Sequence, residues 1–277
     1  ENVKSTEINK QDKAMFEQFD FFLNVYNDEQ KKAIVSPKKV VLCVAGAGSG
    51  KTTVLTKRIE FLIKFKGVAP EKILAITFTR KARTEMQVRL EKNGCKGVKV
   101  ETFNSFCEKF LLRHNDIAYD KVVRMMTYGD KIRMIKNSLQ SLGLEGEDVL
   151  DIYFSKGQRK MKTNDQLFNV FVNDCYFIVD YFKAKGVKVE KFYTDESGRM
   201  VYNVCKLIEG EMEKRGLRTF MDQLVDTLRV FRKGVVPSYE HVLVDEYQDV
   251  NNIQIDFLKL LRWNNLFCVG DPRQAIY

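Results

Sequence analysis

An apolar run that breaks into glycines constrains this chain more than any other feature. Residues 41–59 read VLCVAGAGSGKTTVLTKRI, a strand-like segment, then small residues, then a lysine, two threonines and a helical pattern. Gly46, Gly48 and Gly50 let the backbone turn so that successive N–H groups point at one spot. The first N–H groups of the helix that follows favour an anion there as well. We therefore expect a phosphate-binding loop between a strand and a helix.

The residues after the glycines indicate which phosphates the loop would hold. Lys51 would neutralise the β- and γ-phosphates of a nucleotide, and the Thr52 hydroxyl would bind Mg²⁺. The usual motif begins with glycine, whereas Ala45 stands at that position here. A glycine-rich turn with a chance lysine is the alternative. The strand before and the helix after favour the nucleotide site.

A second segment supplies the acids that such a site needs. In VLVDEYQD, Asp245 and Glu246 follow a buried strand, and parallel sheets place their ligands at the carboxyl ends of strands. Asp245 would hold Mg²⁺, while Glu246 would orient and deprotonate a water. The alternative is that these two acids are solvated at the end of the strand and form no site. The sequence thus predicts nucleotide hydrolysis only if this segment meets the loop.

Five apolar runs predict the fold class. They cover residues 40–46, 73–78, 98–103, 241–246 and 266–271. Four are continuous and rich in β-branched residues, which indicates strands buried on both faces, while 98–103 alternates and is expected nearer an edge. Helical patterns follow over 51–66 and 80–93. The prediction is an α/β fold with a parallel sheet flanked by helices.

The alternation of strands and helices lapses between residues 106 and 219. Helical stretches fill that segment, which predicts a mainly helical insertion. We expect an N-terminal extension over 1–19, a discontinuous α/β domain over 20–107 and 216–277, and the insertion over 108–215.

Charge and cysteine content restrict the partners. The net charge of +9 favours a polyanion, nucleic acid before an anionic membrane. No apolar run approaches the roughly 20 residues of a spanning helix, and the N-terminus has no signal-peptide pattern. The six cysteines form no C-x-x-C pair, which is typical of reduced thiols. We expect a cytoplasmic protein without a membrane partner.

The ordered motifs resemble one known family. AGAGSGKTT (45–53), TFTRKARTEM (77–86), TFNSFC (102–107), VDEYQDVNNIQ (244–254) and VGDPRQAIY (269–277) are similar to the motifs of superfamily 1 DNA helicases of the UvrD/Rep/PcrA type. The resemblance implies a RecA-like P-loop domain, called 1A, that carries an inserted helical subdomain, 1B. It also implies ATP and Mg²⁺ as cofactors.

The resemblance assigns nucleotide contacts residue by residue. Gln30 would read the adenine edge, although Asn27 and Gln30 also form a helix capping pattern. Gln248 and Gln274 would sense the γ-phosphate. The loop contacts would come from Ala45, Gly46, Ala47, Gly48, Ser49, Gly50, Lys51, Thr52 and Thr53.

It also assigns contacts to single-stranded DNA. The candidates are Phe78, Thr79, Arg80, Thr102, Phe103, Asn104 and Tyr277. Exposed rings can stack on unpaired bases for about 1–3 kcal/mol each, whereas core packing is the commoner role of a phenylalanine beside a strand. Arg80 and Asn104 stand where relatives often have Asn and His. The basic run at 156–162 is a candidate for contacting duplex DNA, or a solvated surface.

The resemblance predicts a 3′-to-5′ DNA helicase that acts on single strands and on junctions between single- and double-stranded DNA. Its relatives continue into domains 2A and 2B, so we expect residues 1–277 alone to hydrolyse ATP very slowly and not to unwind DNA. Three alternatives remain: the helicase arm of a helicase–nuclease, a nucleic-acid-binding ATP switch, and a metabolite kinase. The kinase gives no reason for the acidic segment.

Overall fold

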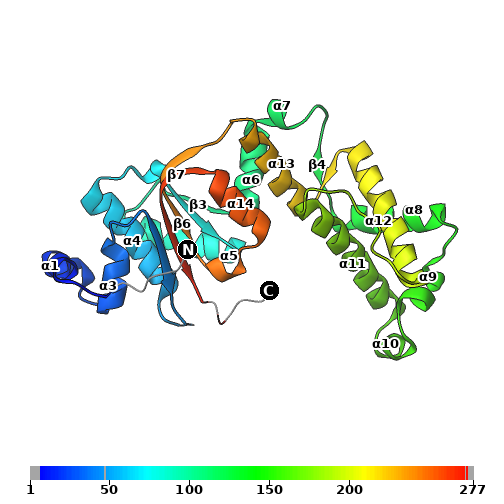
Figure 1. The fold of residues 1–277 in the computed structure, drawn as a ribbon, viewed down its shortest axis with the longest axis horizontal. Helices are drawn as coiled ribbons and strands as arrows, with labels where there is room; N and C mark the ends of the chain where they lie inside the picture. The colour runs from blue at the N-terminus through cyan, green and yellow to red at the C-terminus, as the bar shows by residue number, and fades with distance from the viewer. Residues whose placement is uncertain (1–6, 47, 272, 274–277) are drawn as a thin grey trace. The chain divides into compact units, whose positions relative to one another are not determined.

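The computed structural model describes residues 7–46, 48–271 and 273, which form two units (Figure 1). The first unit combines the chain up to residue 106 with the chain from residue 235, and the second comprises residues 107–234. Each unit has its own hydrophobic core.

A five-stranded parallel sheet forms the centre of the first unit. The strand order is β1 (Val40–Val44), β7 (Arg262–Gly270), β6 (Ser238–Val244), β2 (Ile73–Thr77) and β3 (Lys99–Thr102). Each of the five predicted apolar runs coincides with one of these strands or overlaps it, and β6 and β7 begin before the predicted runs. The predicted α/β class with a parallel sheet is confirmed.

Helices α4 (Lys51–Lys66) and α5 (Arg80–Lys92) cover one face of this sheet and share its core. Outside α4 lie α1 (Lys10–Gln18), α2 (Asp20–Leu23) and α3 (Asp28–Val35). Phe103 at the start of α6 (Phe103–Arg113) packs edge-on against Phe257 of α14 (Asn252–Leu260). Short 3₁₀ turns, η1 (Pro70–Lys72) and η2 (Tyr247–Asp249), complete the unit.

Strand β1 differs from its prediction. Val40, Leu42 and Val44 are exposed, so this strand is not buried on both faces. The reason is its place at one edge of the sheet of described strands, which composition does not reveal. Strand β3 forms the other edge, as its alternating pattern predicted.

The second unit is mainly helical, as predicted for the insertion. It contains the rest of α6, then α7 (Asn115–Ala118), α8 (Tyr128–Ser141), α9 (Gly146–Tyr153), α10 (Lys156–Met161), α11 (Asn164–Ala184), α12 (Glu196–Arg215) and α13 (Phe220–Arg232). The two-residue strands β4 (Arg124–Met125) and β5 (Leu217–Arg218) pair in parallel. Buried side chains from α8, α9, α11 and α12 form its core.

The unit boundaries differ from the predicted domains at two places. Residues 216–234, expected in the α/β domain, lie in the second unit, because Asp222 of α13 pairs with Lys183 of α11 and Thr219 donates to Asp180. The expected N-terminal extension contributes Phe16 of α1 to the core of the first unit. The described helices include none long and apolar enough to cross a membrane.

Candidate functional site

Two of the three glycines after β1 have a left-handed backbone. Gly48 and Gly50 have φ of +72° and +79°, in the left-handed region that side chains disfavour. Lys51 is the first residue of α4, and the carbonyl of Gly50 accepts from Val54 N at 2.8 Å. The loop therefore ends at the N-terminus of a sixteen-residue helix, where an anion is favoured.

The acidic segment after β6 meets this loop. The Lys51 Nζ lies 3.1 Å from Glu246 Oε2, and the Thr52 hydroxyl donates to Asp245 Oδ2 at 2.8 Å. The two segments come together because β1 and β6 run parallel with β7 between them. The carboxyl ends of all three strands therefore lie on the same side of the sheet, where the strands end.

Asp245 is a buried acid. Asp245 is 3% exposed, and burial raises the pKa of its carboxyl above the ordinary value of 3.8. The hydrogen bond from Thr52 lowers that pKa, and the charge of Glu246 raises it further. A carboxylate held this way gains from a bound cation, because a cation offsets the charge that burial disfavours.

Glu246 adopts a strained backbone conformation. Its φ of +50° is the one positive value among the described non-glycine residues. Its N–H donates to Asp245 Oδ1 at 3.0 Å, and its Oε2 accepts from Gln248 Nε2 at 2.8 Å. These contacts, together with the ion pair to Lys51, stabilise a backbone conformation that a non-glycine residue rarely adopts.

Gly270 at the end of β7 allows Gln248 to approach. Gln248 Oε1 accepts from Asp271 N at 2.9 Å, and a Cβ on residue 270 would lie 2.7 Å from that oxygen and 3.1 Å from Gln248 N. A glycine is thus required for Gln248 to link β7 with Glu246.

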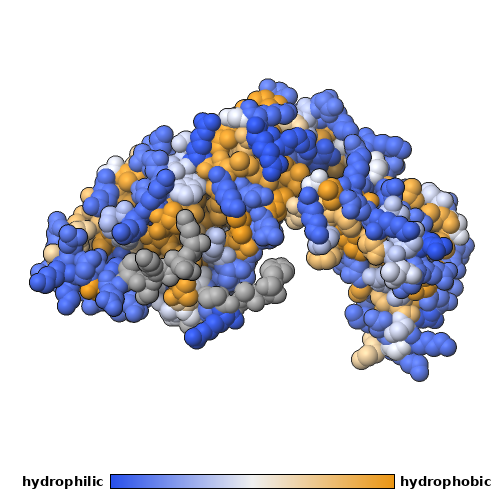
Figure 2. Space-filling view, viewed as in Figure 1, coloured by the Kyte–Doolittle hydropathy of each residue, from blue (hydrophilic) through white to orange (hydrophobic). Residues whose placement is uncertain are grey.

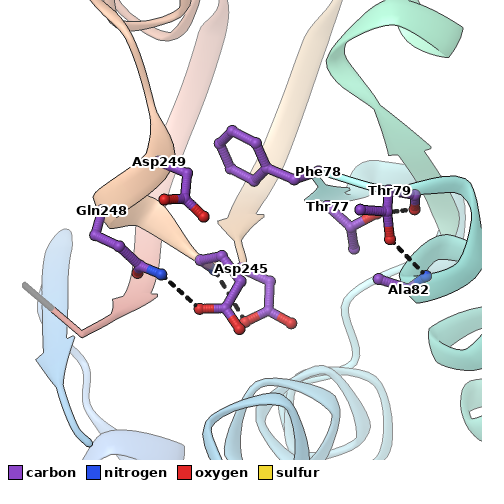
Figure 3. Close-up of a pocket in the computed structure, with 8 residues that line it drawn as sticks. Thr77, Phe78, Thr79, Ala82, Asp245, Gln248 and Asp249 are labelled. Atoms are coloured by element: carbon purple, nitrogen blue, oxygen red, sulfur yellow. Dashed lines mark hydrogen bonds between the residues drawn. The ribbon is translucent and has the colours of Figure 1, made fainter. Parts of the chain in front are cut away.

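A cavity of about 310 Å³ opens beside the acidic pair (Figure 3). Its lining joins two segments, the chain after β6 and the chain from the end of β2 into α5. The residues are Asp245, Glu246, Gln248 and Asp249 from the first, and Thr77, Phe78, Thr79 and Ala82 from the second. In Figure 3 the Phe78 ring lies across the cavity from Gln248. Side chains predicted for ATP and side chains predicted for DNA therefore share one cavity.

Gln30 forms the capping pattern that the sequence indicated, while its contact with adenine stays a prediction. It forms a capping box with Asn27, and its Nε2 donates to Ser49 O at 3.0 Å. The cap fixes the side chain at the N-terminus of α3, next to the loop.

Three further polar residues of this region were not predicted. Arg89 of α5 donates to the Thr53 hydroxyl at 3.3 Å, which places a guanidinium beside the first turn of α4. Asp271 is 4% exposed and lies 4.0 Å from the position of a Cβ on Gly46. Asp249 Oδ1 is buried and has no hydrogen-bond partner among the described residues. Asp249 and Asp271 stand inside quoted motifs, but Arg89 carried no local signal.

Comparison with known proteins identifies the family of the chain. The family model described as UvrD/REP helicase N-terminal domain matches residues 26–277. The chain belongs to this family. It is 30% identical over 93% of its length to a "Probable DNA helicase II homolog" of Mycoplasma capricolum, and 31% identical over 92% to "ATP-dependent DNA helicase PcrA" of Staphylococcus aureus. The matches cover 36% and 34% of those proteins, so the chain spans about a third of their length.

The family implies Mg²⁺, and the residues at the site fit that ion. The Thr52 hydroxyl and Asp245 carboxylate supply two hard oxygen ligands 2.8 Å apart, and Mg²⁺ in nucleotide sites takes one or two protein oxygens beside phosphates and waters. Within the described residues, no group of three or more His, Cys, Asp or Glu side chains could hold a metal alone.

The described residues that were predicted to contact DNA differ in exposure. Thr79 and Arg80 are exposed, and Phe78 and Asn104 are half-buried. Phe103 is 3% exposed between Phe78 and Phe257, so core packing is what the structure shows, and stacking on a base is not open to it here. Buried Thr102 accepts from Ser105 N. Ala47, Gln274 and Tyr277 lie outside the described residues.

Proposed function

We propose that this chain is the N-terminal, ATP-binding half of an ATP-dependent DNA helicase that moves 3′ to 5′ along single-stranded DNA. The observation that supports it most is the meeting of Lys51 and Thr52 with Glu246 and Asp245. The family of the chain and the names of its relatives point the same way.

Nucleotide binding would begin at the loop. The N–H groups at the start of α4 and the Lys51 ammonium bind the phosphates. Arg89 beside Thr53 and Gln30 beside Ser49 lie where they can hold the rest of the nucleotide. A bound Mg²⁺ would neutralise phosphate charge during the reaction. Thr52 and Asp245 would hold that ion.

Hydrolysis would depend on releasing Glu246 from its ion pair. Glu246 Oε2 is now bonded to both Lys51 and Gln248. A γ-phosphate that takes the Lys51 ammonium leaves Glu246 able to orient water and accept its proton. Gln248 connects that carboxylate to Asp271 at the end of β7. This link would report the state of the nucleotide to β7.

DNA contact would use the same cavity. Phe78 lines it together with the acids, while Thr79 and Arg80 start α5 nearby. The ring would stack on an unpaired base and Arg80 would hold a phosphate. Binding and release of nucleotide would thereby change the grip on the strand.

The decisive measurement is ATP turnover by the full-length parent protein, with and without single-stranded DNA, beside Glu246→Gln. We expect stimulation by DNA and a loss of about 10²-fold or more in the variant, because general bases contribute 10²–10⁴-fold. No stimulation would favour an ATP-dependent switch. An unaffected variant would remove Glu246 from the chemistry.

Residues 1–277 alone are proposed to hydrolyse ATP very slowly, because the relatives are about three times longer and an arginine supplied by another domain is worth about 10³–10⁵ in such reactions. Rapid DNA-stimulated turnover by this chain alone would contradict the proposal.

A further inference from the structure

A second cavity lies within the helical unit, away from the residues discussed so far. It measures about 300 Å³, and its apolar wall consists of Leu111 and Leu112 of α6, Val123 and Met125 around β4, and Tyr119. Leu112 is 73% exposed and the nearby Val122 is 91% exposed, so apolar side chains reach the surface around the opening. Figure 2 shows a hydrophobic surface area over α7, which belongs to the same end of the unit.

One buried acceptor in the lining lacks a donor. Gln223 of α13 lines the cavity and is 6% exposed, and its Oε1 has no hydrogen-bond partner among the described residues. Buried amide oxygens are nearly always paired, because an unpaired one loses its bonds to water without replacement. A ligand for this cavity should therefore carry an N–H or O–H donor.

The charges around the cavity argue against a phosphate-bearing ligand. Arg218 donates to buried Asp226 at 3.0 Å, and Arg124 forms two bonds to buried Asp130 at 2.6 and 2.9 Å. Both guanidinium charges are thus offset, and Glu108 adds a negative charge to the lining. A cationic ligand would find Asp130 and Asp226 already paired with these two arginines. The chemistry favours a neutral donor on a large apolar body.

From these observations we propose that this cavity receives a tryptophan side chain of a partner protein. An indole is apolar over most of its surface and carries a single donor, which would pair with Gln223 Oε1. The Arg218 guanidinium already lies 5.4 Å from the Tyr119 ring centre, so an aromatic guest would join an existing aromatic–cation arrangement. Buried aromatic anchors of this kind dominate many protein interfaces.

A second copy of this chain does not fit the role of partner. Its single tryptophan, Trp263, donates its indole N–H to Leu258 O at 2.8 Å within the first unit. Trp263 of another copy is therefore not available as the guest. The inference is independent of ATP hydrolysis and goes beyond the proposed function.

The test compares two probes that differ in one hydrogen-bond donor. Indole and 1-methylindole are titrated into the 277-residue protein while its amide resonances are followed by NMR. We expect indole to bind about five-fold more tightly, the typical value of one hydrogen bond, with shifts centred on Leu111, Tyr119 and Gln223. Gln223→Leu should abolish that preference. Gln140→Leu, an exposed glutamine of α8, should keep it.

Four results would overturn the proposal. They are equal binding of the two probes, shifts located elsewhere, tighter binding of 2′-deoxyadenosine than of indole, and self-association that Gln223→Leu removes. The third would indicate a nucleobase site and the fourth a contact between copies. If Gln223→Leu does not fold, the preference between the two indoles in the unaltered protein still decides.

Discussion

At the scale of single residues, burial and hydrogen bonds have opposite effects on the pKa of Asp245. Asp245 accepts from Thr52 and from Glu246 N, yet burial still raises the pKa of its carboxyl. A group whose pKa is higher in the folded state favours folding when it is protonated. Its contribution to stability therefore falls as the pH rises from 3.8 through the raised pKa.

Asp245→Asn removes that charge while keeping an oxygen for Thr52. We expect the variant to be more stable at neutral pH by about 0.5–2 kcal/mol, the usual gain when a strained functional group is relieved, and to lose its affinity for Mg²⁺–nucleotide. Thermal unfolding and nucleotide titration measure the two effects. An unchanged or lower melting temperature would show that burial of this charge costs no stability.

Gly270→Ala tests the link between Gln248 and the acids. The added Cβ would lie 2.7 Å from Gln248 Oε1, so we expect displacement of Gln248 and loss of its bond to Glu246. In the full-length parent, ATP turnover should fall with little change in nucleotide affinity. Equal loss of both would indicate general damage to the loop, which Gly210→Ala, at an open position of α12, would not share.

At the scale of elements, helix α3 depends on a buried arginine. Arg58 of α4 is 3% exposed, and its guanidinium donates to Ala33 O, Ile34 O and Ser36 O at 3.0–3.1 Å. These carbonyls end α3, where a cation is favoured. Phe267 lies under the same group, 4.7 Å away. The other end of α3 carries Gln30.

Arg58→Met should therefore affect both stability and nucleotide binding. Three carbonyls would lose their donor, so we expect the free energy of unfolding to fall by about 2–5 kcal/mol. Nucleotide affinity should fall as well, because α3 would no longer hold Gln30 beside Ser49. Denaturant unfolding and nucleotide titration provide the readouts, with Arg133→Met on the exposed face of α8 as the control. Full stability in Arg58→Met would show that α3 is fixed by its apolar contacts.

At the scale of the whole molecule, the net charge of +9 favours binding to a polyanion, and such binding weakens as the salt concentration rises. Affinity for single-stranded DNA should fall with a slope of about −0.7 per phosphate contact in a plot of log affinity against log salt. Arg80→Ala should make that slope less steep by about 0.7. Lys191→Ala, in the helical unit, serves as the charge-matched control. A slope that Arg80→Ala leaves unchanged would remove Arg80 from the phosphate contacts.

Local patterns in the sequence determined much of this protein. The left-handed glycines 48 and 50, the helix that begins at Lys51, the five parallel strands and the edge position of β3 all follow from neighbouring residues, because turn geometry and burial periodicity are local properties. The acidic pair was recognised by its position after a strand. Its role beside the loop required the two segments to meet.

Only the tertiary structure decided which distant groups came together. The 2.8 Å contact between Thr52 and Asp245, the guanidinium of Arg89 beside Thr53 and the burial of Phe103 depend on strand order and on helix packing across the chain. The exposure of β1 and the place of α13 in the helical unit have the same origin. Periodicity tells which side of an element is apolar, but the element that covers it is chosen by packing over the whole unit.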